Sequence, residues 1–193
     1  MLTQNGIVSN WWRDKEKIRP DEIIERVTED ALLHHLVDYD AYDPHTGRTY
    51  GELSPFISTT AGTVVRDALG RRNLELSAEY TATFFATDGF RRPGWIFSGY
   101  VFTLGRKAVA QVGFAEEVRE LNIYTDYLPF QPEGEIVAKV HVPAVQLEEA
   151  WALEPVLDRR DASLARWPRI TQRLDNAGVY VPPEELVNLR ELL

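Results

Sequence analysis

The stretch Pro129–Pro143, PFQPEGEIVAKVHVP, decides the fold expected for this chain. Its second half, residues 136–142, is rich in valine and predicts a buried strand. Glu133 and Glu135 lead into that strand. Residues two apart in an extended chain point to the same side, about 6.6 Å apart. Because like charges at that distance repel, we expect a cation, a hydrogen-bond donor or a substrate beside them. A solvated loop without function is the alternative.

Composition narrows the class of protein. The chain has 193 residues, of which 44% are hydrophobic, and this length and composition suit a globular protein that buries most of its apolar surface. It contains no cysteine, which excludes disulfides, a thiol nucleophile and thiolate metal ligands. The formal net charge of −9 argues against a protein that coats nucleic acid through its overall charge.

No apolar run approaches the ~18 residues of a membrane span. The N-terminal stretch MLTQNGIVSNWWRDKEK has no hydrophobic core of the secretory kind. We therefore expect a soluble, cytoplasmic protein. Export, or delivery to a target cell, by a route that needs no such signal is the alternative.

The rest of the chain predicts an α+β protein, with helices first, strands in the middle and helices at the end. Pro20, followed by acidic residues, begins a predicted helix over 19–27. A second helix is expected over 63–69, and the chain is expected to be helical from Gln146 onward. Strands are expected over 56–60, 95–104, 109–112, 121–124 and 136–142.

Three short motifs occur in a recognisable order. WWRDKEKIRPDEI contains Arg13, the strand FISTT contains Ser58, Thr59 and Thr60, and PEGEIV contains the two glutamates. Over residues 11–151 this order resembles the mono-ADP-ribosyltransferases of the cholera-toxin type. These carry an Arg at the end of the first strand, a Ser-Thr-Ser strand and a Glu-x-Glu pair. Thr60 stands where the last Ser of that family is usually found.

The resemblance implies an ADP-ribosyltransferase-like fold: a split, mixed β core of two small sheets with flanking helices and an NAD cleft between the sheets. It implies a catalytic domain over residues 1–151. Residues 152–193 have no counterpart in the resemblance and are expected to form a helical C-terminal extension packed on that domain.

The resemblance also implies an activity with NAD as substrate. Release of nicotinamide from NAD makes an oxocarbenium-like cation, which a fixed carboxylate stabilises. Glu135 would supply that carboxylate and Ser58 would hold it. A forked guanidinium suits a pyrophosphate, the role implied for Arg13. Thr59 and Thr60 complete the expected NAD-binding residues.

Glu133 would serve the acceptor. In the family's pattern a Glu at this position accompanies arginine acceptors, because a second carboxylate attracts the guanidinium and can take its proton. The resemblance thus implies transfer of ADP-ribose to a protein arginine, as in a toxin or effector, and slow hydrolysis of NAD when no acceptor is present. A nucleic-acid acceptor is less favoured, and no metal is expected.

Other interpretations stay open. Arg13 suits an ordinary surface position, and Ser58 suits a cap for the helix expected near residue 63. The whole chain suits a non-catalytic scaffold of the same type that binds a partner. A glycoside hydrolase is weaker, because two carboxylates two apart on one strand are too close to flank a sugar bond. The pair His34-His35 suggests a metal site, but adjacent helical positions do not converge on one ion.

Overall fold

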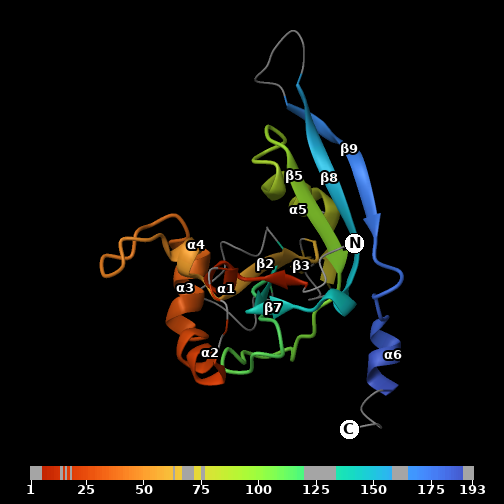
Figure 1. Ribbon diagram of the computed structural model, residues 1–193. Coiled ribbons are helices and arrows are strands. Elements are labelled where there is room, and N and C mark those ends of the chain that lie inside the picture. The colour runs from red at the N-terminus through yellow and green to blue at the C-terminus, as the bar shows by residue number, and fades with distance from the viewer. Residues whose placement is uncertain are drawn as a thin grey trace. The chain divides into compact units, whose positions relative to one another are not determined.

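The computed structural model describes residues 6–13, 15, 17, 19–62, 64–66, 72–74, 77–119, 134–157 and 165–188. Its helices are α1 (Asn10–Arg13), α2 (Pro20–Arg26), α3 (Glu29–Val37), α4 (Tyr50–Leu53), α5 (Ala78–Ala86) and α6 (Pro183–Asn188), as labelled in Figure 1. Its strands are β1 (Ile7–Val8), β2 (Phe56–Thr60), β3 (Val64–Arg66), β4 (Arg72–Leu74), β5 (Gly94–Gly99), β6 (Glu135–Lys139), β7 (His141–Val142), β8 (Leu147–Leu157) and β9 (Ala165–Asp175).

The chain forms two compact units. We call the first the β6 unit: it comprises Ile7–Glu75 and Val101–Val142. The second, the hairpin unit, comprises Met1–Gly6, Leu76–Tyr100 and Pro143–Leu193. The chain therefore leaves the β6 unit after Glu75 to build α5 and β5, returns at Val101 before β6, and leaves it again after Val142.

The helices of the β6 unit begin at residues suited to the task. Pro20 is the first residue of α2, where its missing N–H costs nothing. The Thr28 side chain accepts from the Ala31 N–H to cap α3. Thr49 and Glu52 form a reciprocal capping box at α4. Such caps typically contribute about 1 kcal/mol each, so these short helices begin where the sequence dictates.

Strand β6 is the central element of the β6 unit. It pairs antiparallel with β2 on one side, and on the other it exchanges two backbone hydrogen bonds between Val137 and Glu116. All five of its residues are buried. Val137 lies in a core with Trp11, Leu32 and Phe56, among others. A strand that is buried on both faces and hydrogen-bonded along both edges has few polar residues. This explains the run IVAKV in the sequence.

The hairpin unit has one three-stranded antiparallel sheet in the order β5-β8-β9. Figure 1 shows β8 and β9 as long strands running side by side. Helix α5 packs against β5, and the side chain of Ser77 caps it by accepting from the Tyr80 N–H. Gly99 lies where β5 shifts register against β8, and a Cβ there would lie 2.2 Å from the carbonyl oxygen of Gln146. Glycine is therefore required for that close approach.

The observed elements confirm the α+β class and correct several details. The helical C-terminal extension expected over 152–193 is wrong, because residues 152–157 and 165–175 are strands and, among the described residues of this range, α6 alone is helical. Strand β8 also runs across residue 151 without a break. The helix expected over 63–69 is wrong at 64–66, which form β3, and residues 109–112 are turn, not strand. Among the described residues, four small sheets with antiparallel strand pairs stand where two mixed sheets were expected. The strand expected over 121–124 lies outside the described residues.

Candidate functional site

The pairing of β2 with β6 brings three of the sequence-predicted site residues onto one face. Thr60 lies directly opposite Glu135, and Ser58 lies opposite Val137. Directly opposed residues of an antiparallel pair share a face, as do residues two apart along one strand. Ser58 is therefore a diagonal neighbour of Glu135, at the ~7–8 Å typical of such neighbours. This face carries two hydroxyls and a carboxylate.

Glu135 is buried although it carries a carboxyl group. Only 7% of the residue is exposed. The preceding Gly134 has a φ of +62°, a left-handed conformation that favours glycine, and its carbonyl accepts from the Ala61 N–H. The glycine of the Glu-Gly-Glu motif thus turns the chain so that Glu135 enters the strand. A carboxylate held in so dry a place interacts strongly with any nearby cation.

Ser58 belongs to a hydrogen-bonded chain that the sequence did not predict. His35, on α3, contacts the Ser58 hydroxyl through Nε2 at 3.0 Å and the Ser54 hydroxyl through Nδ1 at 2.8 Å. The Ser54 oxygen also accepts from the Phe56 N–H. Burial lowers the pKa of His35 to about 4, so the ring is neutral at pH 7. A neutral imidazole donates from one nitrogen and accepts at the other, so it fixes the orientation of both hydroxyls.

We expect stability to fall in acid because of His35. Its folded pKa of about 4 lies below the ordinary value of 6.5, so protons favour the unfolded chain. This contribution is complete above pH 6.5 and is lost as the pH falls towards 4, amounting to about 3 kcal/mol. Urea unfolding at several pH values should show a steeper loss for the wild type than for His35→Gln. Identical slopes would contradict a neutral, buried imidazole.

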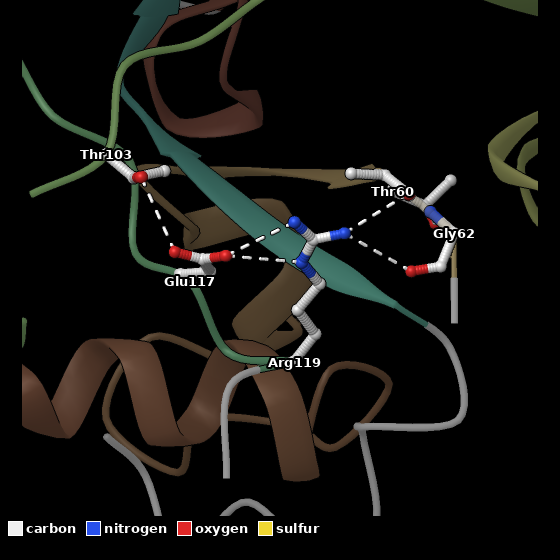
Figure 2. A network of polar contacts seen from close by, with 6 residues as sticks. Thr60, Gly62, Thr103, Glu117 and Arg119 are labelled. Carbon is white, nitrogen blue, oxygen red and sulfur yellow. Dashed lines mark hydrogen bonds and ion pairs between the residues drawn. The ribbon is translucent and has the colours of Figure 1, made fainter. Parts of the chain in front are cut away.

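Arg119 ties the end of β2 to the segment that follows Glu116. Its guanidinium donates to the carbonyls of Ala61 (3.2 Å) and Gly62 (3.4 Å) and to the carboxylate of Glu117 (3.2 and 3.3 Å). Figure 2 shows the guanidinium lying across β6, between Glu117 and Gly62. The backbone N–H of Arg119 donates to the backbone carbonyl of Glu135. The cluster therefore adjoins Glu135 through the backbone.

A buried ion pair lies farther along β6. Lys139 and Glu116 have side chains that are 0% and 1% exposed, and their charged atoms are 2.5 Å apart. Lys139 also donates to the carbonyls of Ala108 and Gln111. Burial lowers the pKa of Lys139, and the bond to Glu116 opposes that shift. The pair fixes the 108–111 loop against β6.

Arg13 is not where a first-strand residue was expected. Strand β1 ends at Val8, and Arg13 is the last residue of α1. Helix α1 is anchored where the Trp11 N–H donates to Ser54, just before β2 begins. Glu135 pairs with the opposite end of β2. The Arg13 side chain is exposed, and within the described ranges no hydrogen-bond or ion-pair partner engages it.

The remaining predicted residues divide as follows. Thr59 points to the other face of β2, because neighbours in a strand alternate, and its hydroxyl donates to the carbonyl of Ile136. Glu133 lies outside the described residues. Within the described ranges there is no cluster of three or more His, Asp or Glu side chains placed to hold a metal. His34 instead stacks on Tyr50 and contacts Asp38.

An open groove of about 580 Å³ lies elsewhere in the β6 unit. Its lining includes Val27, Arg106 and Gln111, and none of the predicted site residues contributes to it. Lys107 pairs with Glu29 there at 2.9 Å. The groove is thus separate from the β2–β6 face.

No family model matches the chain, and no curated protein matches it. Among solved structures, EcPltA is similar with a TM-score of 0.45 and 16% sequence identity, over 93% of this chain and 79% of that one. No helix in the described part of the chain is long and apolar enough to cross a membrane.

Proposed function

We propose that the chain is an NAD-dependent mono-ADP-ribosyltransferase that modifies arginine on a protein. The observation that carries this proposal is the face shared by Ser58, Thr60 and Glu135, with a buried carboxylate flanked by two hydroxyls. The motif order in the sequence supports it independently. A toxin or effector is the class of protein that such an activity suits.

The chemistry assigns a role to each residue on this face. The bond between the ribose carbon and the nicotinamide nitrogen breaks, and the electron pair leaves with nicotinamide. Glu135 stabilises the positive charge that develops on the ribose, in a site where low polarity strengthens the interaction. Ser58, oriented by His35, acts as a positioning residue for the carboxylate. Thr60 offers its hydroxyl to the same substrate region.

Arg13 is proposed to bind the pyrophosphate of NAD. Its exposed guanidinium has no partner among the described residues and is therefore available to an anion. The pyrophosphate of NAD is bonded to C5′ of the same ribose whose C1′ carries nicotinamide. A residue that binds the pyrophosphate therefore lies near the reacting ribose without having to touch Glu135.

Arg13→Ala should weaken NAD binding about tenfold to a hundredfold. This is the effect of losing one charge-assisted contact, about 1.5–3 kcal/mol. Calorimetric titration with NAD measures it directly. Arg26→Ala, at another exposed arginine of the β6 unit, is the matched control and should bind like the wild type. Unchanged affinity in Arg13→Ala would remove this residue from the site.

Glu133 is proposed to serve the acceptor. The arginine nitrogen attacks the ribose carbon, forms the new bond and gives its proton to a carboxylate. Glu133→Gln should therefore lose transfer to arginine while keeping much of the slow hydrolysis of NAD. The assay incubates the protein with labelled NAD and an arginine acceptor, then measures nicotinamide and labelled acceptor side by side. Equal loss of both products would contradict this division of roles. Absence of both products in the wild type would favour the non-catalytic scaffold.

A further inference from the structure

The end of the β2–β6 ladder is held by one side chain. The Ala61 N–H donates to the carbonyl of Gly134 at 3.1 Å, and the Arg119 N–H donates to the carbonyl of Glu135 at 2.8 Å. The guanidinium of Arg119 binds the carbonyls of Ala61 and Gly62. The carbonyls of Gly134 and Glu135 thus accept from two segments that the Arg119 side chain joins.

The guanidinium itself is firmly held. Its ion pair with Glu117 joins side chains that are only 16% and 11% exposed. Glu117 also accepts from the Thr103 hydroxyl at 3.5 Å. Figure 2 shows Thr103, Glu117, Arg119 and Gly62 in sequence across the strand. Because a guanidinium presents its donors in a rigid plane, it can bind a carboxylate and two carbonyls at once, which an ammonium on a flexible stem does less well.

We propose that Arg119 is a positioning residue that fixes the backbone of Glu135 and so aims its carboxylate. This proposal rests on the proposed function of Glu135. The left-handed Gly134 just before Glu135 makes the entry to the strand conformationally permissive. Arg119 removes that freedom by closing the turn at Ala61 and Gly62 against β6. Arg119 and Glu117 satisfy each other, so neither is assigned contact with NAD.

The test combines a kinetic and a structural readout on the full chain. Arg119→Met should lower kcat for nicotinamide release by up to about 100-fold, the cost of a small misplacement of a catalytic group, with KM for NAD unchanged. Arg119→Lys should stay impaired, because it keeps the charge and loses the fork. Hydrogen exchange at the Ala61 amide should become about tenfold faster, as for the loss of one charge-assisted hydrogen bond. Arg169→Met removes an exposed Arg–Glu pair of β9 and should change none of these quantities.

The outcomes separate the possible failures. Faster exchange together with lower kcat supports the proposal. A normal kcat in Arg119→Met would overturn the proposal. So would a lower kcat with normal exchange at the Ala61 amide, or full activity in Arg119→Lys. If Arg119→Met does not fold, Glu117→Gln removes the partner charge and should change both readouts in the same direction by less. If the wild type releases no nicotinamide, the proposed function fails. Exchange at Ala61 then decides alone whether Arg119 holds this turn.

Discussion

Glu135→Gln is expected to slow nicotinamide release from NAD about 100- to 1,000-fold, or roughly 2.7–4 kcal/mol of barrier, because one fixed charge opposite the developing cation is lost. The substitution keeps the shape of the side chain. Glu135 is 7% exposed, and a neutral amide is easier to bury than a carboxylate, so the fold should persist. Release of nicotinamide over time at saturating NAD measures the effect.

The control is Glu148→Gln, an exposed glutamate on β8, which should release nicotinamide at the wild-type rate. Both hydrolysis and transfer should be lost in Glu135→Gln, since both pass through the same ribose cation. A Glu135→Gln protein as active as the wild type would contradict the proposed role of Glu135. It would favour the alternative, in which the Glu-Gly-Glu motif is a solvated loop before a strand and has no function.

Lys139→Met should lower the free energy of unfolding by about 3–5 kcal/mol. The substitution leaves the carboxylate of Glu116, 1% exposed, without its cation in the interior. It also removes the donor to the carbonyls of Ala108 and Gln111. The measurement is urea unfolding at pH 7.

Two further variants isolate the cause. Lys107→Met breaks the exposed pair with Glu29 and should cost less than about 1 kcal/mol. Combining Lys139→Met with Glu116→Leu removes both charges and should be less destabilising than Lys139→Met alone, because no unpaired charge stays buried. A Lys139→Met protein within 1 kcal/mol of the wild type would show that the buried pair does not hold the 108–111 loop.

Local signals in the sequence predicted the elements around the site well. The strand FISTT forms β2 over the expected residues, and Pro20 with its acidic neighbours begins α2. The valine-rich run after Glu135 forms β6 and β7. In each case, neighbouring residues determine the element. β-branched side chains favour the strands, and a proline in the first turn favours the helix.

The C-terminal strands were missed because tertiary pairing overrides propensity. Strand β8, LEEAWALEPVL, is rich in Leu, Glu and Ala, which favour helix in isolation. In the fold, Ala150 pairs with Phe97 on one side and with Leu174 on the other. A strand between two others is determined by those neighbours, and the sequence of β8 alone does not contain them.

The polar partners of the site residues could not be predicted either, because they lie far away in the sequence. His35 meets Ser54 and Ser58, which are 19 and 23 residues away, whereas the adjacent pair His34-His35 by itself suggests only a metal site. Arg119 reaches Ala61 across 58 positions. A buried His beside hydroxyls leaves no periodic signal in a sequence. Motif order indicates Ser58 and Glu135 as candidates, whereas no local pattern in the sequence indicates that His35 and Arg119 lie beside them.

A crystal structure of Glu135→Gln with NAD bound tests the proposed NAD site most directly. We expect the ribose attached to nicotinamide to lie within hydrogen-bonding distance of the substituted side chain at position 135 and of the Ser58 or Thr60 hydroxyl, with the pyrophosphate at Arg13. NAD bound away from the β2–β6 face, or a protein that binds no NAD at saturating concentration, would contradict it.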